Sequence, residues 1–358
     1  MCSNTTLLMS FRFRITLGYD KIIYDLKKEI MVSVIVTGAS GHLGANLIRF
    51  LINQSYNVRA IVHEDKRAVE GLDIDLLFAD VLDLASLKKA FFGSEVVYHL
   101  AALISLSKRD FDLMYRINVQ GTRNVIEACR YAGVRRLVYF STIHTLCCNT
   151  TGELIDENKP LVKQGQALPY DWTKAIAERL VLTAVSKGLD AVIITPTAVI
   201  GPHDYRLSYM SRFLLHLYHG KIKALVKGGF NWVDARDVIL GAVSAENNGL
   251  CGERYILAGR YLSLTDLAQQ VEEVTRQKVA HIVFPMWLAR TGASIAGSIS
   301  RLSGKKQLYS SQSLYTLRHH QNISYAKAII ELDYHPRPIR DTIKDTFDWF
   351  AEHSYLKK

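Results

Sequence analysis

Short apolar runs alternate with amphipathic stretches along the first half of the chain. The apolar run at residues 32–37 predicts a buried strand, and residues 43–53 that follow it have the apolar spacing of a helix. Because strands and helices continue to alternate in this way, the pattern predicts βαβ units, a parallel sheet, and helices on both of its faces. The other predicted strands are residues 57–62, 95–100, 136–141 and 191–195, and the other predicted helices are residues 85–92, 111–131 and 172–186.

The chain beyond Pro202 has fewer clean strands and more helix, with residues 255–257 as one strand candidate. We therefore expect an α/β fold with a Rossmann-type doubly wound parallel sheet at residues 31–204. A smaller, mostly helical C-terminal substrate-binding cap is expected at residues 205–358. Parts of that segment, about residues 228–258, are expected to return to the first domain.

We expect no signal peptide in residues 1–30, because Arg12, Arg14 and Asp20 lie close to their apolar patch. Met31 directly precedes the first predicted strand. We expect an appended or wrongly assigned, poorly ordered N-terminal extension rather than a functional arm.

The net charge of +10 is spread along the chain, with its densest local excess between Arg206 and Lys227. Nucleic-acid binding would require a concentrated basic face, usually beside a known module, and no such module is present. We therefore expect no nucleic-acid partner. The basic stretch has two interpretations, a solvated face or a site for an anionic substrate.

Cysteine usage and hydropathy indicate a cytoplasmic protein. The five cysteines include no C-x-x-C pair and no zinc-ligand spacing, so we expect reduced thiols and no metal site. No uncharged apolar run is long enough for a transmembrane helix.

A glycine-rich turn stands between the first predicted strand and helix. In residues 37–44 (TGASGHLG), Gly38, Gly41 and Gly44 are spaced by three, a variant of the dinucleotide-binding fingerprint. Glycine there allows a tight turn and a close approach of the backbone to a pyrophosphate, while the helix N-terminus offers free N–H groups to the phosphates. The turn therefore predicts a bound dinucleotide.

Tyr170 and Lys174 lie four residues apart, a spacing that puts two side chains on one face of a helix. A nearby ammonium favours the phenolate and lowers the pKa of the tyrosine, which makes Tyr170 a usable general acid or base. The pair follows Phe140-Ser-Thr142, which brings hydroxyls to the C-terminal end of a strand, where sheets of this kind bind ligands.

With these motifs the chain resembles the extended short-chain dehydrogenase/reductases of the NAD-dependent epimerase/dehydratase superfamily, over roughly residues 32–350. Within them it is most similar to the dihydroflavonol-reductase-like proteins and the bacterial proteins grouped with them as sugar epimerases. The further matching segments are Asp80-Val-Leu-Asp83, His99-Leu-Ala-Ala102, Asn118-Val-Gln-Gly-Thr122, Ile200-Gly-Pro202, Asn231-Trp-Val-Asp-Ala-Arg-Asp237 and Leu332-Asp-Tyr-His-Pro-Arg-Pro338.

The resemblance implies a catalytic set of Thr142, Tyr170 and Lys174, with Ser141 as the competitor of Thr142. Asn118 would be a structural residue that distorts its helix. Asp80 and Val81 would flank the adenine, Ala101 and Ala102 an inner ribose, and Pro196 and Val199 the nicotinamide. The predicted cofactor-binding residues are Gly38, Ser40, Gly41, His42, Leu43, Gly44, His63, Arg67, Asp80, Val81, Ala101, Ala102, Tyr170, Lys174, Pro196 and Val199.

The choice between NAD and NADP depends on the end of the second strand. NAD-preferring relatives place an acid where Val62 stands, and NADP-preferring relatives often place an arginine where His63 stands. Lys66 and Arg67 would suit a 2′-phosphate, whereas Glu64 and Asp65 would suit a ribose diol. We favour NADP, with NAD as the alternative.

The substrate is expected to be an apolar carbonyl compound or secondary alcohol. Nucleotide-sugar epimerases of the family typically carry Arg and Asn where this chain has Thr195 and Ala198. The first interpretation is therefore hydride transfer from NADPH, the alternative a nucleotide-sugar epimerase or dehydratase, and the third a non-catalytic NAD(P)-binding regulator.

Several other residues have both a functional and a structural interpretation. His99 and His144 are either proton shuttles or packing residues, and Cys147 and Cys148 are either a redox sensor or reduced thiols at a pocket wall. The family motif around Asp234 and Asp237 is expected to brace the join between sheet and cap. Residues 284–302 carry an apolar stripe that fits either an amphipathic cap helix or a membrane contact, and helices 111–131 and 172–186 would suit a homodimer contact.

Overall fold

The computed structural model describes residues 31–63, 65–148, 150, 152–165, 167–280, 282–284, 317 and 320–357. The predicted N-terminal extension therefore lies outside the described residues. So do Glu64 and all of the 284–302 stripe except Phe284.

Seven parallel strands form the central sheet, in the order β3-β2-β1-β4-β5-β7-β11. This is the strand order of a doubly wound dinucleotide-binding fold. One strand, β3, was not predicted, because it lies at the sheet edge and three of its four residues are exposed. The strands are β1 (Ser33–Thr37), β2 (Asn57–Val62), β3 (Asp75–Phe78), β4 (Val96–His99), β5 (Arg136–Phe140), β7 (Ala191–Pro196) and β11 (Arg254–Leu257).

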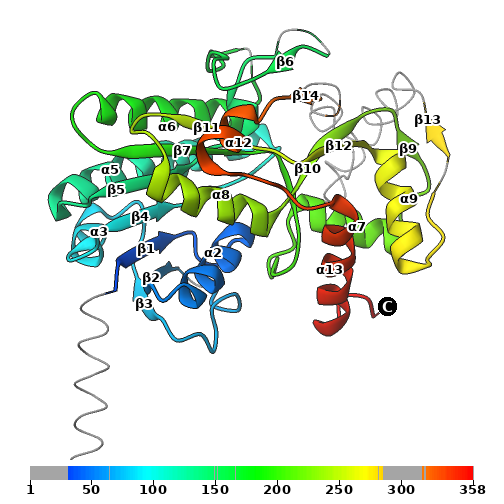
Figure 1. The fold of residues 1–358 in the computed structure, drawn as a ribbon, viewed down its shortest axis with the longest axis horizontal. Helices are drawn as coiled ribbons and strands as arrows, with labels where there is room; N and C mark the ends of the chain where they lie inside the picture. The colour runs from blue at the N-terminus through cyan, green and yellow to red at the C-terminus, as the bar shows by residue number, and fades with distance from the viewer. Residues whose placement is uncertain are drawn as a thin grey trace, which may run out of the picture.

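Helices cover both faces of this sheet, as the alternating pattern predicted (Figure 1). One face is covered by α2 (His42–Asn53), α8 (Ala235–Asn248) and α12 (Ala326–Leu332), and the other by α3 (Leu84–Phe91), α5 (Gly121–Ala132) and α6 (Pro169–Val185). The chain thus leaves the sheet after β7 and returns to it with α8, β11 and α12.

The predicted helix at residues 111–131 is interrupted. It consists of α4 (Phe111–Met114), a π-helical turn (Tyr115–Gln120) and α5. Asn118 lies in the turn, where its Nδ2 donates to the Leu103 carbonyl (3.1 Å) and to Thr173 Oγ1 on α6 (3.0 Å). The expectation of a helix-distorting structural residue is confirmed.

The cap contains α7 (Tyr209–Tyr218), α9 (Leu264–Thr275) and α13 (Ile339–Glu352) around its own apolar core (Figure 1). Besides these helices it carries a three-stranded sheet with β10 at its centre. The remaining strands are β6 (Leu154–Ile155), β8 (Ala198–Ile200), β9 (Leu225–Val226), β10 (Gly229–Asp234), β12 (Arg260–Ser263), β13 (Val283–Phe284) and β14 (Asn322–Ile323).

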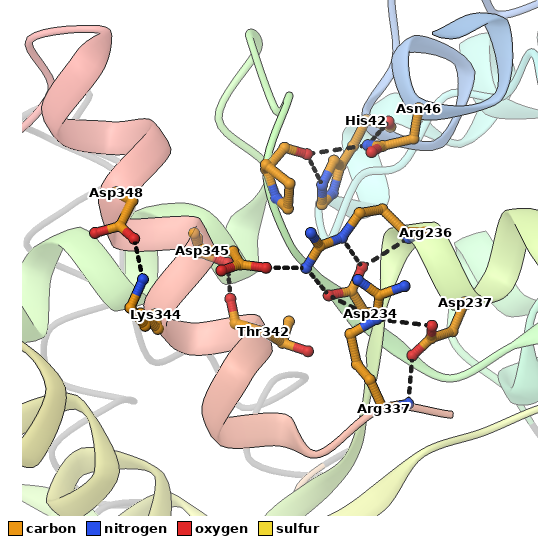
Figure 2. Close-up of polar contacts among 12 residues, drawn as sticks. His42, Asn46, Asp234, Arg236, Asp237, Arg337, Thr342, Lys344, Asp345 and Asp348 are labelled. Atoms are coloured by element: carbon orange, nitrogen blue, oxygen red, sulfur yellow. Dashed lines mark hydrogen bonds and ion pairs between the residues drawn. The ribbon is translucent and has the colours of Figure 1, made fainter. Parts of the chain in front are cut away.

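Ion pairs with two buried carboxylates, Asp234 and Asp237, join the cap to the sheet domain (Figure 2). Asp234 caps α8 and binds Arg236, whose Nη2 also lies 2.7 Å from Asp345 on α13. Asp237 binds Arg337, which precedes α13 (2.8 Å). The expected bracing role of Asp234 and Asp237 is therefore confirmed, since both carboxylates bind arginines there.

In the part of the chain that the structure describes, no helix has the length and apolar composition needed to cross a membrane.

Candidate active site

The glycine-rich turn between β1 and α2 is packed too tightly for any side chain at two positions. Gly38 has φ +74°, and a Cβ there would stand 2.6 Å from the Ala101 nitrogen. A Cβ on Gly44 would stand 2.3 Å from the Gly38 carbonyl oxygen. At Gly41, the N-cap of α2, no side chain caps the helix, so its first N–H groups remain available to a phosphate. The turn therefore fits the pyrophosphate of a dinucleotide.

A cavity of about 340 Å³ opens beside this turn, between the C-terminal ends of the strands and the cap. Polar side chains around Tyr170 form one wall, and apolar side chains from the cap, from the loop after β4 and from the segment after β5 form the others. These apolar residues are Leu100, Ile104, Ile143, Met210, Phe230 and Ile323. The predicted residues that line the cavity are Gly38, Gly41, His42, Leu43, Gly44, Ala102, Thr142, Tyr170, Lys174, Pro196 and Val199.

The predicted catalytic residues come together on one wall. Tyr170 lies in the first turn of α6, which begins at Pro169 rather than at the predicted Trp172, because proline is well suited to the first position of a helix. Thr142 follows the end of β5, and all three members of the predicted set line the cavity.

Ser141 is held away from the role of Thr142. Its Oγ donates to Glu178 Oε2 at 2.5 Å, inside the protein. Thr142 Oγ1 has no such commitment to a described side chain. Of the two candidate hydroxyls, Thr142 is the one left for a ligand.

The electrostatics of Tyr170 differ from the expectation. Lys174 Nζ donates to the Phe140 carbonyl (2.6 Å) and lies 4.4 Å from the centroid of the Tyr139 ring. Burial raises the pKa of Tyr170 above its usual range, and the Asp171 carboxylate adds to this, so the predicted lowering is not found. The phenol is therefore neutral at neutral pH and carries its proton there.

Burial also lowers the pKa of Lys174 to about 7, against the opposing influence of the Glu178 carboxylate. Lys174 is 3 % exposed, which explains the size of this effect. The charge of the ammonium thus changes near neutral pH.

A buried carboxylate behind the catalytic wall was missed in the sequence. Glu178 is fully buried and accepts from Ser141, from Thr145 Oγ1 (3.1 Å) and from Arg254 Nε on β11 (2.7 Å). Arg254 also donates to the Glu157 carbonyl (2.9 Å). The only signal in the sequence was its position, four residues after Lys174 in the predicted helix.

His99 is a packing residue, whereas His144 lines the cavity. His99 is buried between Thr37 Oγ1 (2.7 Å) and Thr122 Oγ1 (3.0 Å), and burial lowers its pKa to about 3, so it is a neutral packing residue. His144 lines the cavity with its ring 5.1 Å from that of His320, and burial lowers its pKa to about 3 as well.

Cys147 and Cys148 are partly exposed free thiols that do not line this cavity. The structure thus does not support the expected place for them at a pocket wall.

The predicted adenosine residues lie outside the cavity. Ser40 Oγ donates to the Asp65 carbonyl (2.6 Å), which ties the glycine-rich turn to the loop after β2. Asp80 Oδ1 accepts from the Leu82 nitrogen (2.9 Å), and Val81 packs against Gly121. His63, Arg67 and Ala101 complete the set of predicted residues that do not line the cavity.

His42 contacts the loop after β8 and also lines the cavity. Its Nε2 lies 3.0 Å from the Pro202 carbonyl oxygen, which also accepts from Asn46 Nδ2 at 3.0 Å (Figure 2). The sequence predicted only a cofactor contact for this residue.

Comparison with known proteins identifies the family. A model of the 3-beta hydroxysteroid dehydrogenase/isomerase family matches residues 35–248. The chain belongs to this family. Its members are NAD(P)-dependent dehydrogenases, reductases and epimerases, so the protein is an NAD(P)-binding oxidoreductase and the resemblance found in the sequence is confirmed.

Individual relatives cover most of the chain. Sterol demethylase protein B of Methylococcus capsulatus is 31 % identical over 91 % of this chain and 100 % of its own. A 4-hydroxy-2-methyl-3-oxo-4-farnesyl-3,4-dihydroquinoline-1-oxide ketoreductase of Stigmatella aurantiaca is 32 % identical over 74 % of this chain and 80 % of its own. The crystal structure of gox2253 has a TM-score of 0.80 at 30 % identity, over 91 % of this chain and 100 % of that one.

A nucleoside-diphosphate-sugar epimerase from Pseudomonas aeruginosa has a TM-score of 0.75 at 23 % identity, over 91 % of this chain and 99 % of that one. This likeness shows a shared fold.

Proposed function

We propose that the protein is a reductase that transfers hydride from NADPH to the carbonyl group of an apolar or amphiphilic compound. One observation carries the proposal: Tyr170, Thr142 and Lys174 meet on the wall of a cavity whose other walls are largely apolar. Such a cavity suits a ligand with one polar, reacting group.

Each residue of the site has its own role in the proposed carbonyl reduction. When bound, the reduced nicotinamide supplies hydride to the carbonyl carbon. Tyr170, neutral in its buried position, donates a proton to the oxygen as negative charge develops there, and Thr142 donates a hydrogen bond to the same oxygen. Pro196 and Val199 would hold the nicotinamide, and Lys174 would hold the ribose hydroxyls beside it.

The alternative, a nucleotide-sugar epimerase or dehydratase, has less support. Its substrate carries a diphosphate, which calls for cationic donors. Among the described residues that line the cavity, Lys174 is the only lysine or arginine, and Phe230 and Met210 occupy the cap wall. Thr195 is fully buried and does not line the cavity.

A panel of apolar ketones, aldehydes and nucleotide sugars, each with NADPH and with NADH, tests the proposal. We expect consumption of NADPH with one or more apolar carbonyl compounds. Turnover of a nucleotide sugar, with none of any apolar carbonyl compound, would overturn the proposal in favour of the epimerase.

A further inference from the structure

A loop of the cap reaches the adenosine end of the cofactor site. The segment between β8 and α7 is fixed along α2, because the Pro202 carbonyl accepts from His42 and Asn46 (Figure 2). Further along this loop, Tyr205 OH accepts from Arg49 Nη2 (3.0 Å). These contacts bring the next residue, Arg206, to the loop that follows β2.

Asp65 in that loop has no accepting capacity left. Its Oδ1 accepts from the nitrogen (3.2 Å) and Nε (3.0 Å) of Arg67, and its Oδ2 accepts from Arg67 Nη2 (2.8 Å) and Arg206 Nε (3.2 Å). A carboxylate offers about four lone-pair positions, so these four donors fill it. The same guanidinium contacts hold the pKa of Asp65 far below its usual range.

Because the carboxylate of Asp65 is occupied, the arrangement favours the binding of NADP over that of NAD. An acid that recognises NAD must accept hydrogen bonds from the ribose hydroxyls, and the carboxylate of Asp65 is already committed to two arginines. Two guanidiniums share the carboxylate of Asp65, and the terminal nitrogens of Arg206 have no hydrogen-bond acceptor among the residues that the structure describes. Ser40, at the pyrophosphate turn, lies directly against this loop.

We propose that Arg206, from the cap, completes with Arg67 a binding site for the 2′-phosphate of NADPH. Asp65 accepts hydrogen bonds from the two guanidiniums, competes with the phosphate for them, and does not bind the ribose. The inference rests on the proposed function for its choice of cofactor, and it gives the basic stretch that begins at Arg206 a role toward an anionic ligand. Guanidinium groups bind phosphate oxygens with paired, charge-assisted hydrogen bonds, which supports this assignment.

Titration of protein fluorescence with NADPH and with NADH tests the site in Arg206→Gln. We expect the affinity for NADPH to fall about tenfold, as for a lost charge-assisted hydrogen bond at a partly exposed site, while the affinity for NADH stays unchanged. Arg212→Gln is the matched control, because it removes the same charge from an exposed position on α7. Unchanged NADH binding also shows that the variant is folded.

Asp65→Asn provides the opposite test, because it removes the competing negative charge with little change in shape. We expect tighter NADPH binding and unaltered NADH binding. Weaker NADH binding in Asp65→Asn would overturn the proposal and assign the ribose to the acid. The proposal would also be overturned if Arg206→Gln lowered the affinities for NADPH and NADH equally, or lowered neither. Because the titrations need no substrate, a failure of the proposed carbonyl reduction leaves their outcome readable.

Discussion

The two ends of the cofactor site secure their polar groups differently. At the nicotinamide end, Lys174 and Glu178 are almost completely buried and bind partners inside the protein. At the adenosine end, Arg67 and Arg206 are more than half exposed and share one carboxylate. A buried network is costly to alter and keeps geometry fixed, whereas an exposed cluster tolerates substitution. Under the two proposals, the first region determines the reaction and the second determines the choice of cofactor.

The largest effect is expected from removing the proposed proton donor, Tyr170. Tyr170→Phe should lower turnover by about a hundredfold or more and leave cofactor affinity nearly unchanged, because only the acid–base group is lost. Tyr209→Phe, which alters another tyrosine of the cavity wall, is the matched control and should stay close to wild type. Near-full activity of Tyr170→Phe would show that the catalytic assignment is wrong, and His144 would be tested next.

A smaller effect, on stability, is expected from the carboxylate behind the catalytic wall. Glu178→Gln leaves the Arg254 guanidinium without its charge partner in the interior, so the free energy of unfolding should fall by on the order of 3 kcal/mol. Denaturant unfolding of the variant measures this, and adding Arg254→Met should recover part of the loss. A loss below about 0.5 kcal/mol, which is typical of a surface substitution, would show that the contacts of Glu178 do not stabilise the buried region.

The smallest effect concerns pH. Since burial lowers the pKa of Lys174 to about 7, its ammonium is present below that pH and is lost above it. Cofactor affinity should therefore decrease several-fold as the pH rises through about 7, measured by fluorescence titration. Glu178 raises the pKa of Lys174, so Glu178→Gln should move this decrease to lower pH. A cofactor affinity that is constant across neutral pH, in the wild type and in Glu178→Gln, would show that the ammonium of Lys174 does not contribute to cofactor binding.

Features that depend on local spacing could be predicted from the sequence. The strands, the turn at Gly38 and the Tyr170–Lys174 pair depend on local spacing, which can be read from the chain directly. The start of α6 was placed at Trp172, because apolar periodicity alone does not mark a helix that begins at Pro169.

Contacts between distant segments could not be predicted from a single sequence. Arg206 and Asp65 are 141 residues apart, and Arg254 and Glu178 are 76 apart. Each pair is brought together only when the cap loop or β11 takes its place in the fold. The sequence therefore predicted which side chains line the cavity better than it predicted the contacts between distant segments.

Hydride tracing tests the central claim most directly. NADPH carrying deuterium on the transferable position of its nicotinamide is incubated with each apolar carbonyl compound and each nucleotide sugar of the panel, and the products are examined by mass spectrometry. The account predicts one deuterium on the carbinol carbon for each NADPH oxidised, and loss of this product in Tyr170→Phe. An isomerised product without net oxidation of the cofactor would contradict it and establish an epimerase.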